Sequence, residues 1–311
     1  MQNSQRPRIV VVGSLNVDLT TIIDRMPRAG ETIFGREFHL GFGGKGGNQA
    51  AAARICGAEV AMVARVGDDL FGPATINDLN RTGIDTQYVT TTPGASSGVA
   101  PIFVDSSGQN RILVVKGAND LLSPQDIDAA ADVIERADIV ILQFEIPLET
   151  VYYALDAAHA RGVRTILNPA PGQAVDVARL RNVDYLIPNE TEAEALTGMQ
   201  IQNLDDARAC AERLIEMGLR QVVITLGANG ALFASKEGVA HIPPFEVAAV
   251  DTSGAGDAFI GSFAYSLASG LSEQDAIARA NLYAALSTLK PGTRGAFATQ
   301  EEWSAEWDRR H

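Results

Sequence analysis

The chain has 311 residues, 46% of them hydrophobic, which is enough for one large α/β domain or two smaller ones. Its formal net charge of −13 argues against nucleic acid and anionic membranes as principal partners, because both require basic surface. The first apolar run, Ile9 to Val12, is too short for a signal peptide or a membrane span, so we expect a cytoplasmic protein.

A buried strand is predicted from Arg8 to Gly13, and polar residues follow it. In open α/β sheets this carboxyl edge is where ligands bind. Asn16 and Asp18 flank Val17, so in an extended segment their side chains point the same way. Such a pair can hold neighbouring hydroxyls, or it can simply form a turn.

The segment from 19 to 43 alternates in short β-like stretches broken by Pro27, which predicts antiparallel strands outside the main sheet. Two further β-like runs, 98 to 105 and 110 to 116, can pair as a hairpin. We therefore expect a small β appendage built from residues near 19 to 43 and 98 to 116.

A glycine-rich segment covers residues 41 to 50. It formally contains the dinucleotide-binding spacing, but that motif normally follows the first strand, and here the first strand ends in a lone Gly13. Lys45 is not followed by Ser or Thr, so the segment is no Walker A loop either. Glycines around Lys45 that lead into Asn48 favour a turn that closes on the hydroxyls of a small sugar, with a purely structural turn as the alternative.

Strands and helices alternate regularly through most of the chain, which predicts a mainly parallel sheet with helices on both faces. We find no linker or internal repeat, so a single large sandwich is expected. The expected strands of the main sheet are 8 to 13, 59 to 66, 138 to 144, 163 to 168, 184 to 187 and 221 to 226. The expected helices are 48 to 55, 69 to 81, 124 to 137, 147 to 161, 190 to 196, 204 to 217, 258 to 268 and 272 to 290, with a short terminal helix.

Three of the expected strands end in residues that suit ligand binding. Glu145 follows one strand, as a ligand contact or as an exposed carboxylate that caps the next helix. Asn189 and Glu192 have the spacing of a capping box, and the alternative is that they hold a hydrated Mg²⁺ and its phosphates. Thr225 and Gly227 end another strand in a glycine turn that can admit an adenine or a phosphate.

The segment from Asp251 to Asp257 follows an apolar run, 247 to 250, that predicts a strand, and it leads into a helix. Gly254 and Gly256 allow close approach to backbone amides at the helix start, which favours an anion site. A carboxylate beside a phosphate site can accept the proton of an attacking hydroxyl, so Asp257 suits phosphoryl transfer. The alternative is that Asp is simply common in first helical turns.

Together these motifs resemble the ribokinase family of ATP-dependent sugar kinases, also called the phosphofructokinase B family. The resemblance covers nearly the whole chain and is carried by residues 10 to 18, 43 to 50, 189 to 192 and 251 to 257. It implies a three-layer α/β/α sandwich with a mainly parallel central sheet. It also implies that the β appendage is a lid over the sugar, through which two subunits form a homodimer.

The resemblance also implies roles for individual residues. Asp257 would be the general base, and the anion hole would consist of the amides of Gly254, Ala255 and Gly256. The implied sugar contacts are Asn16, Asp18, Gly44, Lys45, Asn48 and Glu145. Those implied for the nucleotide and its Mg²⁺ are Asn189, Glu192, Thr225, Gly227 and Asn281. Those implied for a monovalent cation, K⁺, are Asp251, Ser253, Gly295 and Thr299.

The chain departs from the family pattern at two places. Gly47 stands where the family commonly has Ala, and the loop at 290 to 294 is longer than usual. The reaction expected is transfer of the γ-phosphoryl group of ATP to O5 of D-ribose. The alternatives are a kinase of the same fold for 2-deoxyribose, fructose, tagatose or a nucleoside, a non-catalytic sugar or nucleotide sensor, and a dehydrogenase that uses residues 41 to 46.

Overall fold

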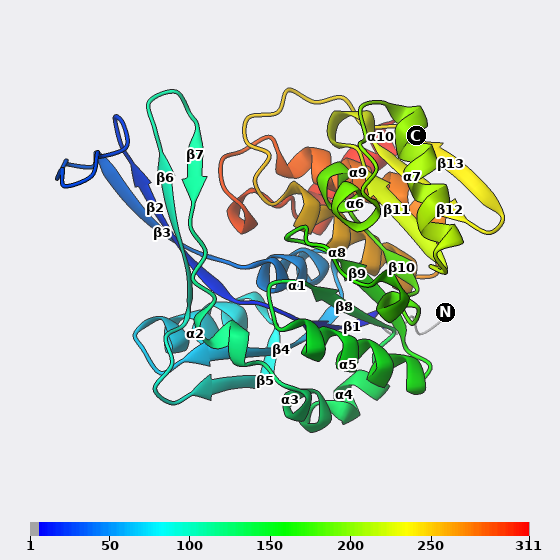
Figure 1. Cartoon of the computed structure of the whole chain (residues 1–311), viewed down its shortest axis with the longest axis horizontal. Coiled ribbons are helices and arrows are strands. Elements are labelled where there is room, and N and C mark those ends of the chain that lie inside the picture. Colours follow the sequence, from blue (N-terminus) through cyan, green and yellow to red (C-terminus); the bar gives the residue numbers. More distant parts are fainter. Residues whose placement is uncertain (1–5, 311) are drawn as a thin grey trace.

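The computed structural model describes residues 6 to 310. A nine-stranded sheet forms its centre (Figure 1). The strands are β1 (Arg8–Val12), β4 (Glu59–Gly67), β5 (Asp85–Thr92), β8 (Ile139–Gln143), β9 (Arg164–Asn168), β10 (Tyr185–Leu186), β11 (Gln221–Thr225), β12 (Ala231–Ser235) and β13 (Gly238–Ile242). Their order in the sheet is β13-β12-β11-β10-β9-β8-β1-β4-β5, parallel from β11 to β5 and antiparallel at β12 and β13.

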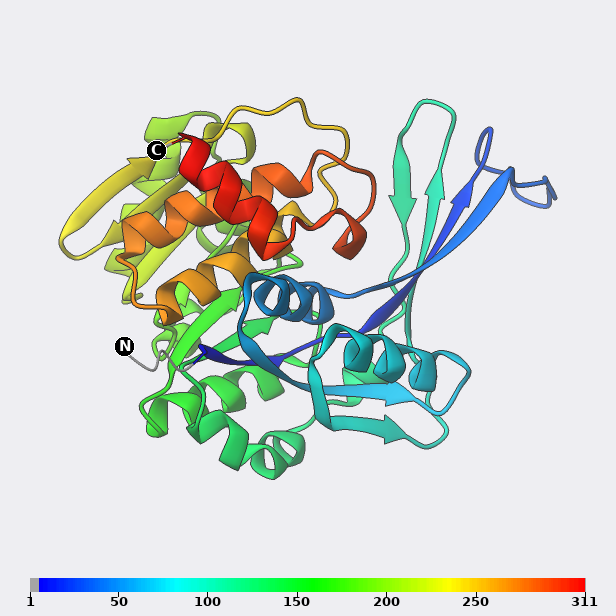
Figure 2. The same ribbon diagram turned by 180° about the vertical axis from the view of Figure 1, so that it is seen from behind.

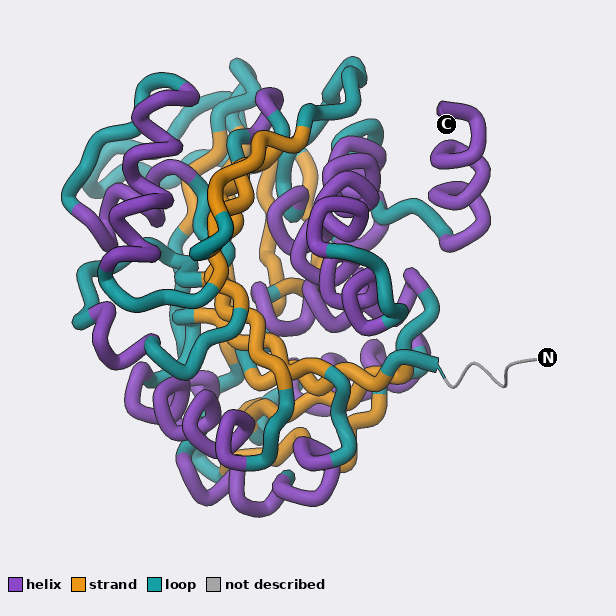
Figure 3. The backbone as a smooth tube through the Cα atoms, turned by 90° about the vertical axis from the view of Figure 1, so that its right-hand side faces the viewer, coloured by secondary structure: helices purple, strands orange, loops and turns teal. Residues whose placement is uncertain are grey.

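Helices cover both faces of this sheet (Figure 3). One face carries α1 (Lys45–Cys56), α2 (Phe71–Thr82), α8 (Ala255–Ala268) and α9 (Glu273–Ser287), with α10 (Gln300–Arg310) packed against α9. The other carries α3 (Pro124–Ala129), α4 (Ala131–Glu135), α5 (Leu148–Ala160), α6 (Glu190–Thr197) and α7 (Leu204–Glu216).

Strand β1 shows why both faces need helices. Its residues alternate between the faces, as in any strand. Ile9 and Val11 pack with the first group of helices, and Val10 and Val12 pack with the second. A strand that is apolar on both sides is stable only when both sides are covered, which places β1 in the middle of a sandwich. The predicted three-layer fold is confirmed.

A second, four-stranded sheet projects from the sandwich (Figures 1 and 2). It consists of β3 (Glu37–Gly43), β2 (Asn16–Ile22), β6 (Gly98–Val104) and β7 (Asn110–Ile112), in that order, and we call it the small sheet. The predicted hairpin is present as β6 and β7. Only β2 and β6 pair in parallel; the other neighbours are antiparallel. Because only three residues separate the end of β1 from the start of β2, the chain passes directly from one sheet to the other.

Some predicted elements were wrong. The run from 247 to 250 forms no strand, because its end is held by the last turn of α9, where Thr288 O accepts from the amides of Val250 and Asp251. The expected helix from 124 to 137 is interrupted at Ala130 and forms α3 and α4. The hairpin of β12 and β13 was not predicted at all.

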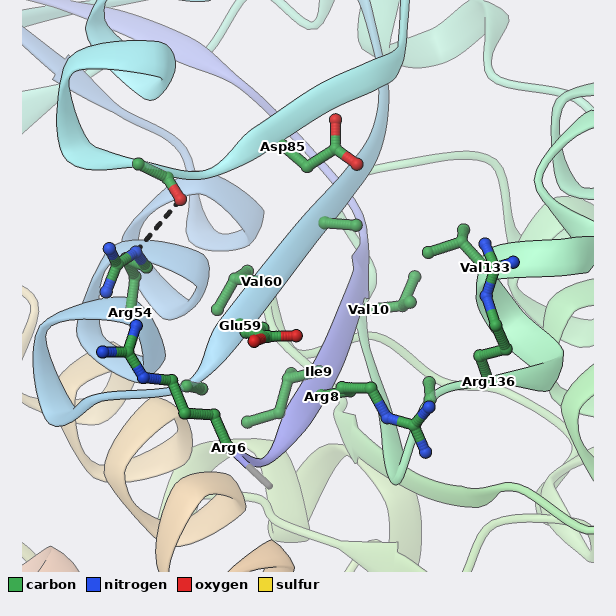
Figure 4. Close-up of a pocket in the computed structure, with 14 residues that line it drawn as sticks. Arg6, Arg8, Ile9, Val10, Arg54, Glu59, Val60, Asp85, Val133 and Arg136 are labelled. Atoms are coloured by element: carbon green, nitrogen blue, oxygen red, sulfur yellow. Dashed lines mark hydrogen bonds between the residues drawn. The ribbon is translucent and has the colours of Figure 1, made fainter. Parts of the chain in front are cut away.

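One cavity, of about 340 Å³, lies at the amino ends of β1 and β4, away from the predicted ligand edge. Figure 4 shows the arginines around it, including Arg6, Arg8 and Arg54, with Glu59 among them. Its described lining includes none of the predicted site residues. Between residues 6 and 310, none of the helices has the length and apolar character needed to cross a bilayer.

Candidate active site

A larger cavity, of about 1030 Å³, lies between the small sheet and the carboxyl ends of β1 and β8. Every predicted sugar contact lines it: Asn16, Asp18, Gly44, Lys45, Asn48 and Glu145. Three elements bring them together, since β2 supplies the first two residues, the start of α1 supplies the next three, and Glu145 follows β8. The glycine segment therefore starts a helix from the small sheet, and it is no part of a parallel dinucleotide-binding unit.

Gly44 allows this connection. It has φ 81°, in the left-handed region that favours glycine. A Cβ there would lie 2.7 Å from the amide nitrogen of Asn16. Helix α1 can therefore begin against β2 only because Gly44 has no side chain.

Asp257 lies in the first turn of α8 and is 6% exposed. Its Oδ2 accepts from Asn48 Nδ2 and its Oδ1 from Gln49 Nε2, both at 3.0 Å. Burial raises the pKa of Asp257, although Lys45 and the two amide donors oppose that shift. A carboxylate with a fixed orientation and a raised pKa has the properties of a general base that acts near neutral pH.

Two carboxylates, those of Asp18 and Glu145, line the cavity itself. Burial raises the pKa of Asp18 to about 6, with Arg294 opposing the shift. Glu145 Oε2 accepts from the amide of Lys45 at 3.0 Å and from the hydroxyl of Ser14. Glu145 makes no capping bond to α5, so the capping alternative for it was wrong. It joins the end of β8 to the start of α1.

Lys45 and Asn16 complete the polar wall of the cavity. Burial opposes the charge on Lys45, but Asp257, Glu145 and Glu192 hold the pKa of its ammonium above the usual value. Asn16 Oδ1 accepts from Asn119 Nδ2 at 2.8 Å, so its own amide group remains the donor for a ligand.

Asn189 and Glu192 form the predicted capping box at the start of α6. Asn189 Oδ1 accepts from the Glu192 amide at 2.8 Å, and Glu192 Oε2 accepts from the Asn189 amide at 2.9 Å. Glu192 is 7% exposed, also accepts from Asn168 Nδ2 at 3.2 Å, and has a pKa raised by burial. The pair caps the helix, and its carboxylate lies close enough to Lys45 and Asp257 for their charges to act on it.

The start of α8 departs from the expected anion hole in one respect. Gly254 has φ 76°, and its amide has no acceptor among residues 6 to 310. The amide of Ala255, however, donates to Thr252 O at 3.2 Å. Gly256 lies in the first turn, where helix amides lack intrahelical acceptors. Two of the three predicted amides, those of Gly254 and Gly256, are therefore suited to an anion.

The predicted nucleotide residues lie at the ends of β11 and α6 and on α9. Thr225 donates its amide to Pro188 O at 2.9 Å, which holds the end of β11 beside Asn189. Gly227 has φ 53° and begins a short 3-10 helix. Asn281 Nδ2 donates to Pro243 O at 3.0 Å, so the free group of this side chain is its oxygen.

The structure brings together only part of the predicted cation set. Asp251 accepts from the amides of Ser253 at 2.9 Å and Gly292 at 2.8 Å, and although burial opposes it, these bonds lower the pKa of Asp251. Gly295 lines the same cavity. Thr299 instead caps α10, where its hydroxyl accepts from the Glu302 amide at 3.2 Å, and it is not part of the cavity wall. Residues 6 to 310 hold no group of three acidic, His or Cys side chains arranged for a metal.

Sequence reasoning missed two residues of the site. Gln49 holds Asp257 and is itself held by Gln143 Nε2, which donates to Gln49 Oε1 at 2.6 Å. Arg294 lies in the cavity wall, largely covered, and donates to Asn48 Oδ1. Gln49 directly follows Asn48 in the glycine segment and was within reach of the sequence argument, whereas no local pattern marks Arg294.

Comparison with known proteins gives one family. Residues 6 to 300 match the pfkB family carbohydrate kinases. The chain belongs to this family. A deoxyribokinase of Salmonella typhi is 44% identical over 297 residues, which cover 95% of this chain and 97% of the relative. A mouse (Mus musculus) ribokinase is 42% identical over 306 residues, which cover 97% of this chain and 95% of the relative.

Solved structures of pfkB kinases agree with the fold. An Arabidopsis thaliana ribokinase complexed with ribose and ATP has a TM-score of 0.90 at 30% identity and covers 97% of this chain and 98% of its own. A Thermotoga maritima ribokinase has a TM-score of 0.89 at 34% identity, covering 96% and 99%. The predicted family is confirmed, and the chain is an ATP-dependent sugar kinase of the ribokinase type.

Proposed function

We propose that this kinase transfers the γ-phosphoryl group of ATP to O5 of D-ribose and produces ribose 5-phosphate. The observation that carries the proposal is the position of Asp257, a buried carboxylate in the first turn of α8, within reach of the sugar-side residues of α1. The relatives named ribokinase and the Arabidopsis thaliana complex with ribose and ATP support the choice of substrate.

In the mechanism that we infer, Asn16, Asp18 and Glu145 bind hydroxyls of the sugar and hold it in one orientation. Asp257 accepts the proton of the 5-hydroxyl while O5 forms its bond to the γ-phosphorus. The bond from that phosphorus to the bridging oxygen breaks, and ADP leaves with the electron pair. The amides of Gly254 and Gly256 stabilise the charge on the transferred group.

The donor sets fit the two expected cations to different degrees. Glu192 and Asn189 offer oxygen ligands, which suit a Mg²⁺ ion that keeps most of its waters. Such an ion neutralises phosphate charge when bound. For K⁺ we propose Asp251, Ser253 and Gly295 and leave out Thr299, whose hydroxyl and amide are used at α10. Equal rates in K⁺ and in a bulky organic cation would exclude K⁺ activation.

A second candidate substrate is 2-deoxyribose, favoured by the deoxyribokinase relative at 44% identity. The two sugars differ by one hydroxyl. Asn16 and Asp18 both lie on the cavity face of β2, and the carboxylate of Asp18 is an acceptor that a 2-hydroxyl would satisfy. Ribose is therefore the better match to a carboxylate at this position.

We also propose that the small sheet is a lid and that two copies pair through it. Thr20 and Ile22 face the cavity, so Leu19 and Thr21 face away from it. Across the pairing register, this outer face also carries Phe38 and Phe103. Phe38 is 61% exposed, and an apolar sheet face left open in this way is typical of a protein interface.

A coupled ADP-release assay over ribose, 2-deoxyribose, fructose, tagatose and nucleosides tests the proposal. We expect the highest kcat/KM with ribose. D257N is expected to lower kcat by about 100-fold or more while ATP still binds, because only the proton acceptor is lost. A higher kcat/KM with another sugar would show that ribose is not the preferred substrate. A near-normal kcat in D257N would exclude Asp257 as the general base. Binding of ATP and sugar without turnover would indicate a non-catalytic sensor.

A further inference from the structure

Arg294 is an arginine enclosed in the wall of the active-site cavity, with 11% of its side chain exposed. It lies in the short 3-10 helix Arg294–Ala296, beside the start of α1 (Figure 2). Its guanidinium makes a different bond with each nitrogen: Nε donates to Asn48 Oδ1 at 3.0 Å, Nη1 to Asp78 Oδ2 at 3.0 Å, and Nη2 to Gly43 O at 2.9 Å.

These bonds decide how the amide of Asn48 is turned. Arginine donates hydrogen bonds and accepts none, so the atom of Asn48 that faces Arg294 must be the oxygen. The other end of the same amide, Nδ2, then faces Asp257 and donates to its Oδ2 at 3.0 Å. A chain of bonds therefore runs from Asp78 through Arg294 and Asn48 to Asp257.

The absence of a side chain at Gly47 makes room for Arg294. A Cβ at Gly47 would lie 2.1 Å from Nη2 of Arg294, the nitrogen that binds Gly43 O. Glycine inside a helix is less favourable than alanine, and Gly47 lies inside α1 without a positive φ. The missing side chain therefore serves to admit the guanidinium.

We propose that Arg294 is a positioning residue of this kinase, which orients the amide of Asn48 toward Asp257 and depends on Gly47 for its place. The inference rests on the proposed role of Asp257 as the general base.

The charge of Arg294 adds to its geometric effect. Burial lowers the pKa of Arg294, and the charges of Asp78, Asp18 and Asp257 oppose that shift. By reciprocity, the guanidinium favours the ionised form of Asp257. The other charged groups that act with Asp257 are Lys45, which also favours ionisation, and Glu145, Glu192 and Asp18, which oppose it. Loss of Arg294 leaves the three carboxylates opposed by one cation, which raises the pKa of Asp257.

The first experiment measures kcat against pH for R294Q and R294K with the preferred sugar. We expect R294Q to lose about 10- to 100-fold in kcat, as a misplaced catalytic group does, with the KM for ATP unchanged and the acid limb of the profile moved to higher pH. R294K keeps the charge without the three-way fork, so its acid limb stays near that of the wild type while kcat remains low.

R65Q is the matched control for the loss of an arginine. Arg65 also donates three bonds, two to Asp126 at 2.9 Å each and one to Thr92 Oγ1 at 3.2 Å, and it lies on β4, which does not line the cavity. It is expected to lower the thermal midpoint without moving the pH profile. A pH profile in R294Q that coincides with that of the wild type would overturn the proposal, as would an equal shift in R65Q.

The second experiment is a double-mutant cycle with G47A. In the wild-type background we expect G47A to lower kcat by at least about fivefold, because the methyl group displaces Arg294. In the R294Q background the same change should have almost no effect. Equal effects of G47A in both backgrounds would contradict the dependence on Gly47. Where R294Q does not fold, R294K serves as the second background, and an unchanged kcat in G47A alone would also contradict this dependence. If the wild type shows no sugar-dependent ADP release, the proposed function fails instead.

Discussion

The carboxylates Asp18 and Glu145 line the active-site cavity, Asp257 is bonded to Asn48 in its wall, and the protein holds each of them differently. Asp257 is fixed by two side-chain amides, Glu145 by a backbone amide and a hydroxyl, and Asp18 is influenced by the charge of Arg294. Burial raises the pKa of both aspartates, which makes the ionised site unfavourable for folding. Carboxylates that lower the stability of the folded protein are typical of catalytic sites, where function rather than stability accounts for them.

Asp18 gives a prediction at this scale. Burial raises its pKa from 3.8 to about 6, so it releases its proton at lower pH in the unfolded chain than in the folded one, and stability falls as pH rises through this window. D18N removes the charge, and we expect it to be more stable at pH 7 by on the order of 2 kcal/mol but not at pH 3. Its KM for the sugar should rise, because the charge is lost and a donor NH2 group replaces one of the two acceptor oxygens. Urea unfolding at both pH values and steady-state kinetics measure these effects.

D69N is the control, and its expected effect on stability at pH 7 is opposite to that of D18N. Burial opposes ionisation of Asp69, but bonds from Ser97, Gly72 and Phe71 lower its pKa below the usual value. D69N should therefore be less stable than the wild type at pH 7. A D18N variant that is also destabilised at pH 7 would contradict the assignment of an unfavourable buried charge to Asp18.

The sequence identified some of these residues and missed others for a physical reason. Asn16 and Asp18 follow shortly after β1, so their place in the site follows from the rule that ligands bind at the carboxyl ends of parallel strands. Asn48 was recognised from the glycine-rich motif at the start of α1. Arg294 bonds residues 43, 48 and 78, all more than 200 positions away. Thr299 was assigned to the cation through the family resemblance, and in the structure its hydroxyl accepts from the amide of Glu302 at the start of α10.

At the scale of elements, the parallel strands were predicted well because each is a short, continuous apolar run. The apolar run at 247 to 250 gave the same signal but has no neighbouring strand to pair with, and Thr288 at the end of α9 accepts its hydrogen bonds instead. Of the unpredicted hairpin, β13 is the edge strand and is mostly exposed or half-buried, so its hydrophobic pattern is weak. Strand β12 was missed although three of its five residues are buried.

Asn189 caps helix α6 and is also proposed to hold Mg²⁺ and ATP phosphates. The variant N189A distinguishes these two roles. Loss of this N-cap should lower stability by about 1 kcal/mol. Because Asn189 also holds the carboxylate of Glu192, we expect the KM for Mg²⁺-ATP to rise as well. Urea unfolding and kinetics at varied ATP measure the two effects.

N203A provides the comparison for this cap. Asn203 caps α7 by accepting from the amides of Asp205 and Asp206, at 2.9 and 3.0 Å, and it does not line the active-site cavity. We expect a similar loss of stability with an unchanged KM for ATP. An N189A variant that loses stability but keeps its KM for ATP would restrict Asn189 to capping.

At the scale of the whole molecule, two cations lie in the wall of the active-site cavity, and the small sheet projects beyond the sandwich. The chain has a net charge of −13, yet Lys45 and Arg294 are cations in the wall of the cavity that is proposed to bind the sugar. The acidic chain therefore carries positive charge close to Asp257, the proposed base. The small sheet projects from the sandwich with one side toward this cavity and the other exposed (Figure 1).

The exposed side of the small sheet leads to the last prediction. Phe38 is 61% exposed on β3, opposite Thr21, and Phe103 lies on the same row. If two copies pair through this face, F38E places an unpaired charge in the interface and weakens the dimer by about 3 kcal/mol or more, roughly 100-fold in Kd. The sugar KM should rise too, because a lid without its partner closes less firmly.

L70E is the control, since Leu70 is 91% exposed at the start of α2, outside the small sheet. Sedimentation of the wild type as a monomer, or as a dimer that F38E and L70E leave equally intact, would exclude pairing through the small sheet.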